Sequence, residues 1–347
     1  MTAVYRSQDA AVAAPLVEAR DLKQHYTLKG GLFGEDRTLK AVDGVSFTLG
    51  RGETLAVVGE SGCGKSTLAR MLTLIEAPTS GDLLFEGRPA QDAMRDDPKA
   101  TRGFVQMIFQ NPYGSLNPRQ NVASILAEPL VINTRMSGDE RRRRVREMLA
   151  KVGLRPEHDV RYPHMFSGGQ RQRIAVARAL MLEPRVVIAD EPVSALDISV
   201  QAQVINLLLD LQDEFGLAYV FISHDLSVVR HLARRLMVMY LGRVVEEGEG
   251  GVVFEDPAHP YTRALMAATP AVDPSARKER ATVRGELPSP LNPPPGCPFH
   301  RRCRYARPDC KDRVPELRTV RGRKVACHYA ENLEGEGAGT LRVAATA

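Results

Sequence analysis

Residues 59 to 66 read Gly59-Glu60-Ser61-Gly62-Cys63-Gly64-Lys65-Ser66, and Thr67 follows them. They fit the pattern G-x-x-x-x-G-K-[ST], in which glycines let successive backbone N–H groups turn toward the phosphates of a nucleotide. An apolar run at 54–58 precedes the loop, and a helical pattern follows it as far as Leu72. Run, loop and helix together predict the first unit of a parallel α/β core that binds a nucleoside triphosphate.

The side chains of this phosphate loop have distinct expected roles. Lys65 would contact the β- and γ-phosphates, and Ser66 would offer its hydroxyl to Mg²⁺. A glycine-rich turn without a ligand is the alternative, and the presence of both Lys65 and Ser66 in register argues against it. Cys63 is a small residue that the turn tolerates, and we assign no redox role to its side chain.

A pair of acidic residues follows a second apolar run, 186–189. Asp190, at the end of the expected strand, can hold Mg²⁺ directly or through water. Glu191 can polarise a water molecule for attack on the γ-phosphorus. Two solvated acids after a core strand are a plausible interpretation of this segment alone, but beside the phosphate loop the pair indicates hydrolysis of the nucleotide.

The rest of the chain predicts an α/β fold around this core. Short β-like segments between Leu16 and Leu49 alternate with turn signals, which is typical of an antiparallel sheet. Apolar runs at 186–189 and 218–222 flank a helical segment, 200–214, and this strand–helix–strand order favours a parallel sheet. The apolar residues on one face of that segment are Val204, Leu207, Leu208 and Leu211.

The composition indicates a folded protein of about two domains, since the chain has 347 residues. Hydrophobic residues make up 43% and charged residues 26%, which excludes a wholly disordered chain. The net charge of +5 is too mild to indicate nucleic-acid binding without a concentrated patch. The longest apolar runs have strand length, far below the roughly 18 to 20 residues that cross a bilayer, and the N-terminus makes a poor secretory signal.

Several motifs resemble those of the ATP-binding cassette (ABC) family, and they occur in the order typical of that family. The departure is Phe166, where many members carry Leu, and it affects no catalytic residue. The matches are Tyr26 for the adenine-stacking aromatic residue, Gln110 for the Q-loop glutamine, Phe166-Ser167-Gly168-Gly169-Gln170 for the signature motif, Ser194-Ala195-Leu196-Asp197 for the D-loop and His224 for the switch histidine.

This resemblance implies an ABC-type P-loop NTPase in which ATP is held between two cassettes. The signature motif of one subunit would face the γ-phosphate bound by the other, so hydrolysis would require a dimer. The resemblance gives Gln110 and His224 roles in arranging γ-phosphate and water, and Gln110 a contact with Mg²⁺. Taken alone, Ser167 is a simple helix N-cap, Gln110 a loop amide, His224 a structural histidine and Tyr26 a core aromatic residue.

Three further segments, 111–119, 259–265 and 285–290, resemble the ATP-binding subunits of peptide and nickel importers, and among them the second ATPase subunits of dipeptide transporters. The resemblance implies three kinds of partner, which are a second ATPase subunit, two permease subunits and an extracytoplasmic peptide-binding protein. It also implies a location on the cytoplasmic face of the inner membrane. Residues 111–133 would include surface that meets the permeases, and a plain helical insertion is the alternative. We expect no direct contact with nucleic acid.

Four of the five cysteines gather near the C-terminus: Cys297, Cys303, Cys310 and Cys327. Clustered thiols in a reducing compartment indicate a metal site. Zinc sites usually contain a C-x₂₋₄-C pair, which is absent, whereas iron–sulfur clusters need four thiolates and tolerate several spacings. The subfamily resemblance also points to a [4Fe-4S] cluster, and the eleven Lys or Arg against four Asp or Glu at 284–328 would stabilise its negative charge. Zinc and unliganded thiols are the alternatives.

We therefore expect three parts: an ABC ATPase domain at 14–253 with an Arg-rich helical subdomain at about 111–182, a small C-terminal module at 254–330 with the cysteines, and a flexible tail at 331–347. The expected function is ATP hydrolysis that powers the import of di- or oligopeptides. The alternatives are a non-transport ABC ATPase acting on nucleic acid or ribosomes, an exporter's ATPase, and a subunit for nickel or other small cargo. Cargo cannot be predicted from this chain, because the binding protein and permeases would select it.

Overall fold

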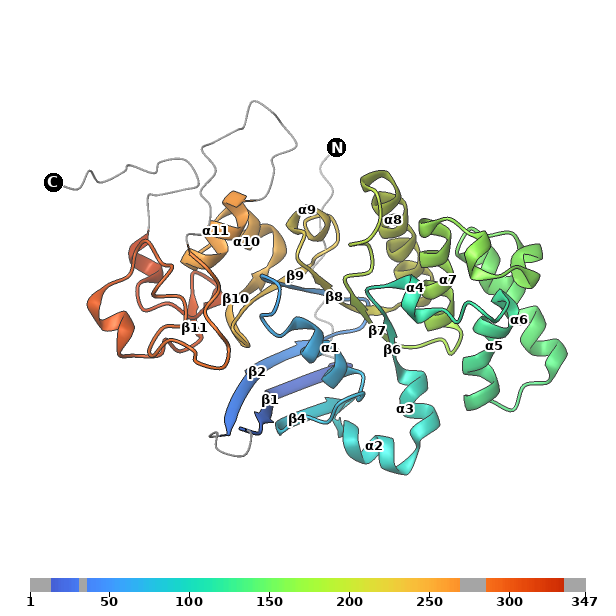
Figure 1. Cartoon of the computed structure of the whole chain (residues 1–347), viewed down its shortest axis with the longest axis horizontal. Helices are drawn as coiled ribbons and strands as arrows, with labels where there is room; N and C mark the ends of the chain where they lie inside the picture. The colour runs from blue at the N-terminus through green and yellow to red at the C-terminus, as the bar shows by residue number, and fades with distance from the viewer. Residues whose placement is uncertain (1–13, 31–35, 269–284, 334–347) are drawn as a thin grey trace.

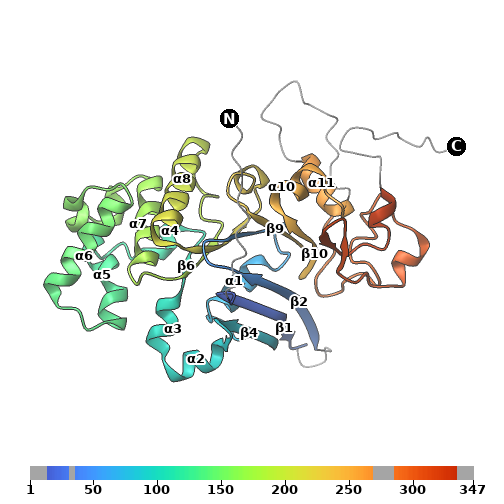
Figure 2. The same ribbon diagram turned by 180° about the vertical axis from the view of Figure 1, so that it is seen from behind.

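The structure is a computed structural model that describes residues 14–30, 36–268 and 285–333. Two β-sheets form its centre, and helices cover them. In both views the helical segment with α5 and α6 lies at one end and the C-terminal segment at the opposite end (Figures 1 and 2).

The smaller sheet is antiparallel and, in the described ranges, has the strand order β2-β1-β4-β5. β1 pairs with β2 on one side and with β4 on the other. This confirms the antiparallel region predicted between Leu16 and Leu49, whereas β4 and β5, which follow the phosphate loop, were not predicted. The strands are β1 (Val17–Leu28), β2 (Arg37–Leu49), β4 (Ser80–Phe85) and β5 (Arg88–Pro89).

The larger sheet has the order β11-β12-β10-β9-β3-β8-β7-β6 among the residues that the structure describes. β3 pairs in parallel with β8 and β9, and β7 pairs in parallel with β6 and β8. The predicted parallel strand–helix–strand unit is therefore confirmed. The strands are β3 (Thr54–Val58), β6 (Val105–Ile108), β7 (Val186–Asp190), β8 (Ala218–Ser223), β9 (Arg235–Tyr240), β10 (Arg243–Glu249), β11 (Arg318–Val320) and β12 (Arg323–Val325).

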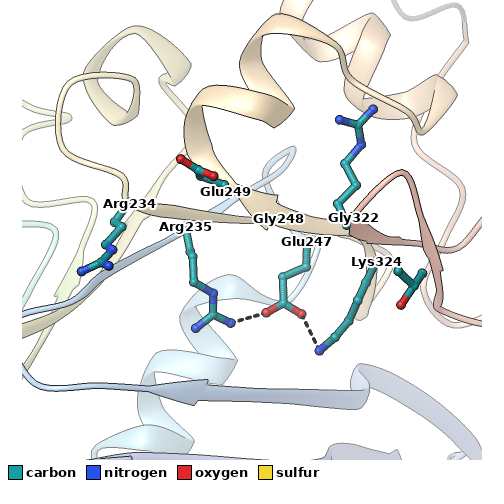
Figure 3. A pocket seen from close by; sticks show the side chains of 9 residues that line it. Arg234, Arg235, Glu247, Gly248, Glu249, Gly322 and Lys324 are labelled. Atoms are coloured by element: carbon teal, nitrogen blue, oxygen red, sulfur yellow. Dashed lines mark hydrogen bonds and ion pairs between the residues drawn. The ribbon is translucent and has the colours of Figure 1, made fainter. Parts of the chain in front are cut away.

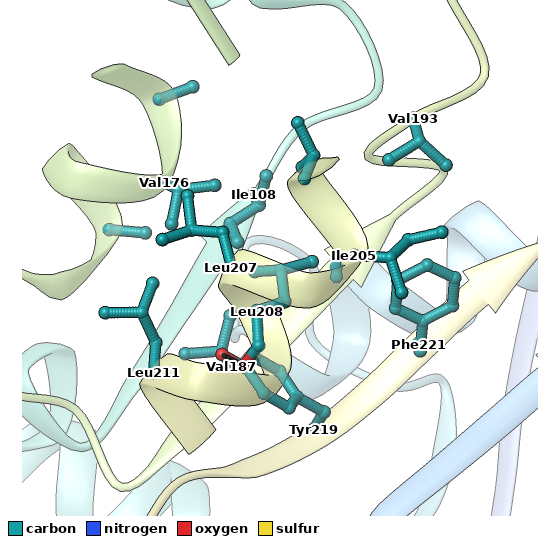
Figure 4. Packing of buried hydrophobic residues seen from close by; sticks show 14 of the residues in the cluster. Ile108, Val176, Val187, Val193, Ile205, Leu207, Leu208, Leu211, Tyr219 and Phe221 are labelled. Atoms are coloured by element: carbon teal, nitrogen blue, oxygen red, sulfur yellow. Dashed lines mark hydrogen bonds between the residues drawn. The ribbon is translucent and has the colours of Figure 1, made fainter. Parts of the chain in front are cut away.

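Two hydrophobic cores lie on the two faces of this sheet, because successive side chains of a strand point to opposite faces. Leu55 and Val57 of β3 belong to the core shared with α1 (Lys65–Leu72) and the antiparallel sheet. Their neighbours Ala56 and Val58 belong to the core shared with the helices on the other face. Side chains of α8 (Ile198–Phe215) pack there over β8, as Figure 4 shows, and the predicted apolar face is buried: Val204, Leu207, Leu208 and Leu211.

The remaining helices connect the strands. The region 111–182 contains four of them, and its limits as a subdomain stay a prediction. The helices are α2 (Ala90–Asp96), α3 (Pro98–Phe104), α4 (Pro112–Ser115), α5 (Val122–Asn133), α6 (Gly138–Lys151), α7 (Gly168–Leu180), α9 (Leu226–Val229), α10 (Gly250–Glu255) and α11 (Pro260–Ala268), with 3₁₀ turns at Pro156–Val160, Pro163–Met165, Pro308–Lys311 and Ala330–Leu333.

The C-terminal residues join the larger sheet, since β12 pairs with both β10 and β11. The fully buried carboxylate of Glu246 in β10 accepts hydrogen bonds from the N–H groups of Ala258 and His259, each at 2.8 Å. Of the expected tail, residues 331–333 belong to a 3₁₀ turn and residues 334–347 lie outside the described residues. Within the described ranges, no helix combines the length and apolar character needed to cross a bilayer.

Candidate nucleotide site

The predicted site residues follow the carboxyl ends of three neighbouring strands. β3 leads into the phosphate loop, β7 ends at Asp190 with Glu191 next, and β8 is followed by His224. Because β3, β8 and β7 are adjacent and parallel, these ends meet at one edge of the sheet, where ligands of open α/β sheets bind.

The phosphate loop needs its glycines for steric reasons. Gly59 and Gly64 have φ angles of 155° and 105°, which L side chains rarely adopt. A Cβ at Gly59 would lie 2.3 Å from the carbonyl oxygen of Met239, and a Cβ at Gly64 would lie 2.1 Å from that of Ala41. The backbone of neighbouring strands therefore encloses the loop and fixes its course.

Lys65 is the first residue of α1, and its side chain reaches back across the loop. Its ammonium group donates to the carbonyl oxygens of Gly59 at 2.8 Å and Glu60 at 3.0 Å. Only 5% of Lys65 is exposed, which concentrates its charge inside the loop. Cys63 is only 1% exposed, and this burial raises the pKa of its thiol, whose sulfur lies 3.9 Å from the ammonium nitrogen of Lys65.

Asp190 and Ser66, the two side chains predicted to hold Mg²⁺ through oxygen atoms, lie in contact. The Ser66 hydroxyl donates to a carboxylate oxygen of Asp190 at 3.3 Å, and Asp190 is only 6% exposed. Burial raises the pKa of Asp190, and the hydrogen bond from Ser66 partly offsets that effect. A buried carboxylate beside a hydroxyl is a donor set that suits Mg²⁺, which prefers oxygen ligands.

Glu191 is held by the two side chains that the resemblance singled out. The Gln110 amide donates to one carboxylate oxygen at 2.8 Å, and Nδ1 of His224 lies 3.1 Å from the other. Glu191 has a φ of 47°, a conformation that non-glycine residues keep only where their surroundings enforce it. Its carboxylate is thus set in one orientation next to the metal-ligand pair.

Tyr26 lies in β1 next to the helix that follows the loop. Its hydroxyl donates to Glu76 at 2.5 Å and also forms a hydrogen bond with the side chain of Thr67. The ring is half-buried. This places Tyr26 beside Thr67, while its stacking on adenine stays a prediction.

The signature motif begins α7 as the sequence predicts for an N-cap. The Ser167 hydroxyl accepts from the N–H of Gln170 at 3.3 Å, and the Gln170 side chain accepts from the N–H of Ser167 at 3.1 Å. A Cβ at Gly169 would lie 2.4 Å from Cγ1 of Val200 in α8, so this end of α7 touches the start of α8. The exposed Asp197 of the D-loop precedes α8 directly.

Two residues that sequence reasoning missed contact the loop through Glu60. Arg302 makes a bidentate ion pair with its carboxylate, and the Tyr261 hydroxyl accepts from its backbone N–H. Tyr261 lies in the segment 259–265 that the resemblance quoted, but no pattern pointed to this contact. Sequence separations of 201 and 242 residues carry no local signal.

The four C-terminal cysteines line one small cavity of about 20 Å³ together with His259, His300 and His328. Burial raises the pKa of Cys297 to about 11 and that of Cys303 to about 12. Across the described residues, no group of three or more His, Cys, Asp or Glu is placed to hold a metal ion. The structure therefore gathers the cysteines around one cavity but arranges them in no metal-ligating group, so the predicted iron–sulfur cluster is not shown.

A larger cavity of about 550 Å³ lies where β9, β10 and β12 meet and contains none of the predicted site residues (Figure 3). Glu247 in its wall forms ion pairs with Arg235 and Lys324. The lining keeps an excess of positive charge, since it has four basic side chains, from Arg234, Arg235, Arg323 and Lys324, against the two carboxylates of Glu247 and Glu249.

Comparisons with known proteins agree with this geometry. The model of the family described as ABC transporter matches residues 42–194, and that described as oligopeptide/dipeptide transporter, C-terminal region, matches residues 245–310. The dipeptide transport ATP-binding protein DppF of Escherichia coli (strain K12) is 60% identical over 331 residues, 94% of this chain and 98% of that protein. The di/tripeptide transport ATP-binding protein DppF of Pseudomonas aeruginosa (strain UCBPP-PA14) is 59% identical over 92% of this chain and 99% of that protein.

A solved structure matches the fold. The ATP-binding cassette MJ0796, in a dimeric post-hydrolysis state bound to ADP and Pi, has a TM-score of 0.59 and 30% identity. The match covers 67% of this chain and 98% of that one. The fold of this chain thus includes a whole cassette of that kind.

Proposed function

We propose that this chain hydrolyses ATP to power the import of di- or oligopeptides, because it belongs to the ABC transporter family and to its ATP-binding subunits for dipeptide and oligopeptide transport. The observation that carries this proposal is the triad Gln110, Glu191 and His224 beside the phosphate loop. It occurs in a chain that is 60% identical to a dipeptide transport ATP-binding protein over nearly its whole length.

The reaction is phosphoryl transfer from ATP to water. Glu191 accepts the proton of the attacking water, while Gln110 and His224 hold its carboxylate and orient the water and γ-phosphate. Lys65 and the loop N–H groups stabilise the charge that develops on the phosphate oxygens. Ser66, Asp190 and Gln110 would hold Mg²⁺, which would supply positive charge to the phosphates.

The catalytic unit would be a pair of cassettes. The exposed D-loop around Asp197 and the end of α7 at Ser167 to Gln170 would face the nucleotide of a second, different ATPase subunit. The dimeric form of the solved cassette supports this arrangement. Free N–H groups at a helix N-terminus suit a γ-phosphate.

The further partners follow from the subfamily. They would be two permease subunits, met in part by residues 111–133, and an extracytoplasmic peptide-binding protein, with this chain peripheral on the cytoplasmic face of the inner membrane. Exposed apolar side chains on α5, Val131 and Ile132, support a protein contact there.

The C-terminal module at 254–330 would hold a [4Fe-4S] cluster on Cys297, Cys303, Cys310 and Cys327. The convergence of the four thiols on one cavity supports this. Iron would need the thiolate forms of these groups, so loading would release protons. The cluster would supply structural cohesion or a redox signal to the module.

Copurification tests the function. The tagged chain, solubilised from membranes, is expected to bring down permease and ATPase subunits and to show dipeptide-stimulated hydrolysis when its binding protein is added. Recovery of nucleic acid or ribosomes instead would favour the non-transport ATPase, and stimulation only by nickel-loaded binding protein would change the cargo.

A further inference from the structure

Glu60, the second residue of the phosphate loop, is held at all of its polar groups. Both terminal nitrogens of Arg302 donate to its carboxylate, at 2.6 and 2.8 Å. Its N–H donates to the Tyr261 hydroxyl at 2.8 Å, and its carbonyl oxygen accepts from Lys65 at 3.0 Å. Of the three residues that make these four hydrogen bonds, Arg302 and Tyr261 belong to the C-terminal part of the chain.

The groups that hold Glu60 are themselves fixed. Tyr261 is fully buried, and its ring lies 4.7 Å from that of Tyr240 and 5.4 Å from that of Phe299. The side chain of Arg302 is only 6% exposed and stands 5.8 Å from the Tyr240 ring. Because packed aromatic rings have few alternative positions, these contacts restrain the loop rather than follow it.

Charge gives Arg302 a second effect. Glu60 brings a carboxylate to the loop that binds a polyphosphate, and the two anions would repel each other in a partly dehydrated site. A bidentate guanidinium neutralises the carboxylate and holds it in one orientation. Without Arg302 that negative charge would stay close to the phosphates.

We propose that Arg302 and Tyr261 are positioning residues that hold the phosphate loop ready for ATP, so that the cysteine-bearing C-terminal segment sets the nucleotide affinity of the cassette. Arg302 lies between Cys297 and Cys303, which makes this segment and the loop one packed unit. The proposal rests on ATP binding at the loop and is independent of the cargo and of whether iron is present.

The test is the affinity of the purified full-length chain for ATP, measured by displacement of a fluorescent ATP analogue. Arg302→Gln is expected to weaken ATP binding about tenfold, because the unpaired carboxylate of Glu60 would then repel the phosphates across a partly solvated site. Arg301→Gln is the matched control, since it removes the same charge from an exposed neighbouring residue, and it is expected to bind like wild type.

A second substitution separates the charge effect of Arg302 from loss of folding. In the Arg302→Gln background, Glu60→Gln removes the uncompensated carboxylate and should recover the part of the affinity that repulsion of the phosphates had cost, which a misfolded chain would not recover. Tyr261→Phe keeps the ring and loses the acceptor, so it should raise KM for ATP in the assembled ATPase with little change in kcat.

Wild-type affinity for ATP in Arg302→Gln, or an unchanged KM for ATP in Tyr261→Phe, would overturn the proposal. Failure of the wild-type chain to bind ATP would instead overturn the nucleotide site itself, so the two failures are distinguishable.

Discussion

The side-chain amide of Gln110 donates to Glu191 at 2.8 Å across 81 positions of sequence. This hydrogen bond joins the start of the helical region to the end of β7. A movement of the segment after β6, for instance on contact with the proposed permease, would therefore move the carboxylate that we propose as the base. The bond offers a physical route between the proposed membrane partner and hydrolysis.

Glu191→Gln should abolish turnover and preserve ATP binding. The amide cannot accept a proton, and loss of a general base costs about 10² to 10⁴ in rate. Phosphate release and nucleotide displacement, measured side by side, check this, and the variant should accumulate as a closed dimer with bound ATP. Asp213→Asn, an exposed carboxylate of α8, is the control, and full turnover in Glu191→Gln would refute the base assignment.

Asp190 predicts a pH dependence of magnesium use. Its pKa is raised above 3.8 by burial, so protons compete with Mg²⁺ at higher pH than at an ordinary aspartate. The Mg²⁺ concentration for half-maximal hydrolysis should fall as pH rises through this raised pKa and then level off. A magnesium titration across acidic to neutral pH checks this, and an unchanged requirement across that range would contradict it.

The same pKa shift predicts the stability of Asp190→Asn. A raised folded pKa means that ionisation costs stability, and this cost appears as pH rises through the folded value. Without Mg²⁺ at neutral pH, the asparagine variant should thus unfold at a higher denaturant concentration than wild type. The difference should vanish below pH 3.8, the ordinary value. A variant that is less stable than wild type at neutral pH would show that burial does not destabilise the ionised carboxylate of Asp190.

Gly169→Ala should destabilise the chain where the start of α7 touches the start of α8. The added Cβ meets Val200 at 2.4 Å, and the stiff valine side chain cannot rotate away freely. Overpacking of this kind costs about 1 to 3 kcal/mol, seen in chemical denaturation. Val200→Ala in the same chain should restore the wild-type value, and Gly103→Ala, where the new Cβ meets nothing within 4 Å, is the control.

The cysteine proposal predicts which thiol holds iron. Cys303→Ser should remove visible absorption and bound iron from the purified complex, whereas Cys63→Ala should retain both, because Cys63 lies in a different core. Iron content by chemical assay is the measurement. Equal iron content in the two variants would contradict the cluster, and zinc in place of iron would favour the zinc alternative.

The sequence predicted those parts of the site that short segments define. Lys65, Ser66, Asp190 and Glu191 lie next to strand ends, so a local pattern sufficed to find them and to assign their chemistry. The helical periodicity of Val204, Leu207, Leu208 and Leu211 predicted which face of their helix is buried. Gln110 and His224 came from the family resemblance, since a lone amide or imidazole has no physical signal of its own.

Contacts between distant segments were beyond such reasoning. The pairing of β12 with β10, and the hold of Arg302 and Tyr261 on Glu60, depend on tertiary packing across the whole chain. β4 was missed because its first three residues are exposed and lack a core-facing alternation. The iron–sulfur prediction had the right convergence of thiols, but no ligating arrangement appears in the described residues.

The central claim is tested most directly by the uptake of a labelled dipeptide into right-side-out membrane vesicles. These vesicles carry the full transporter and are loaded with Mg-ATP. With the wild-type chain, uptake should follow ATP consumption and stop when ATP is omitted. With Glu191→Gln both should cease while the complex stays assembled. Dipeptide uptake that continues in vesicles with the Glu191→Gln subunit would contradict the account.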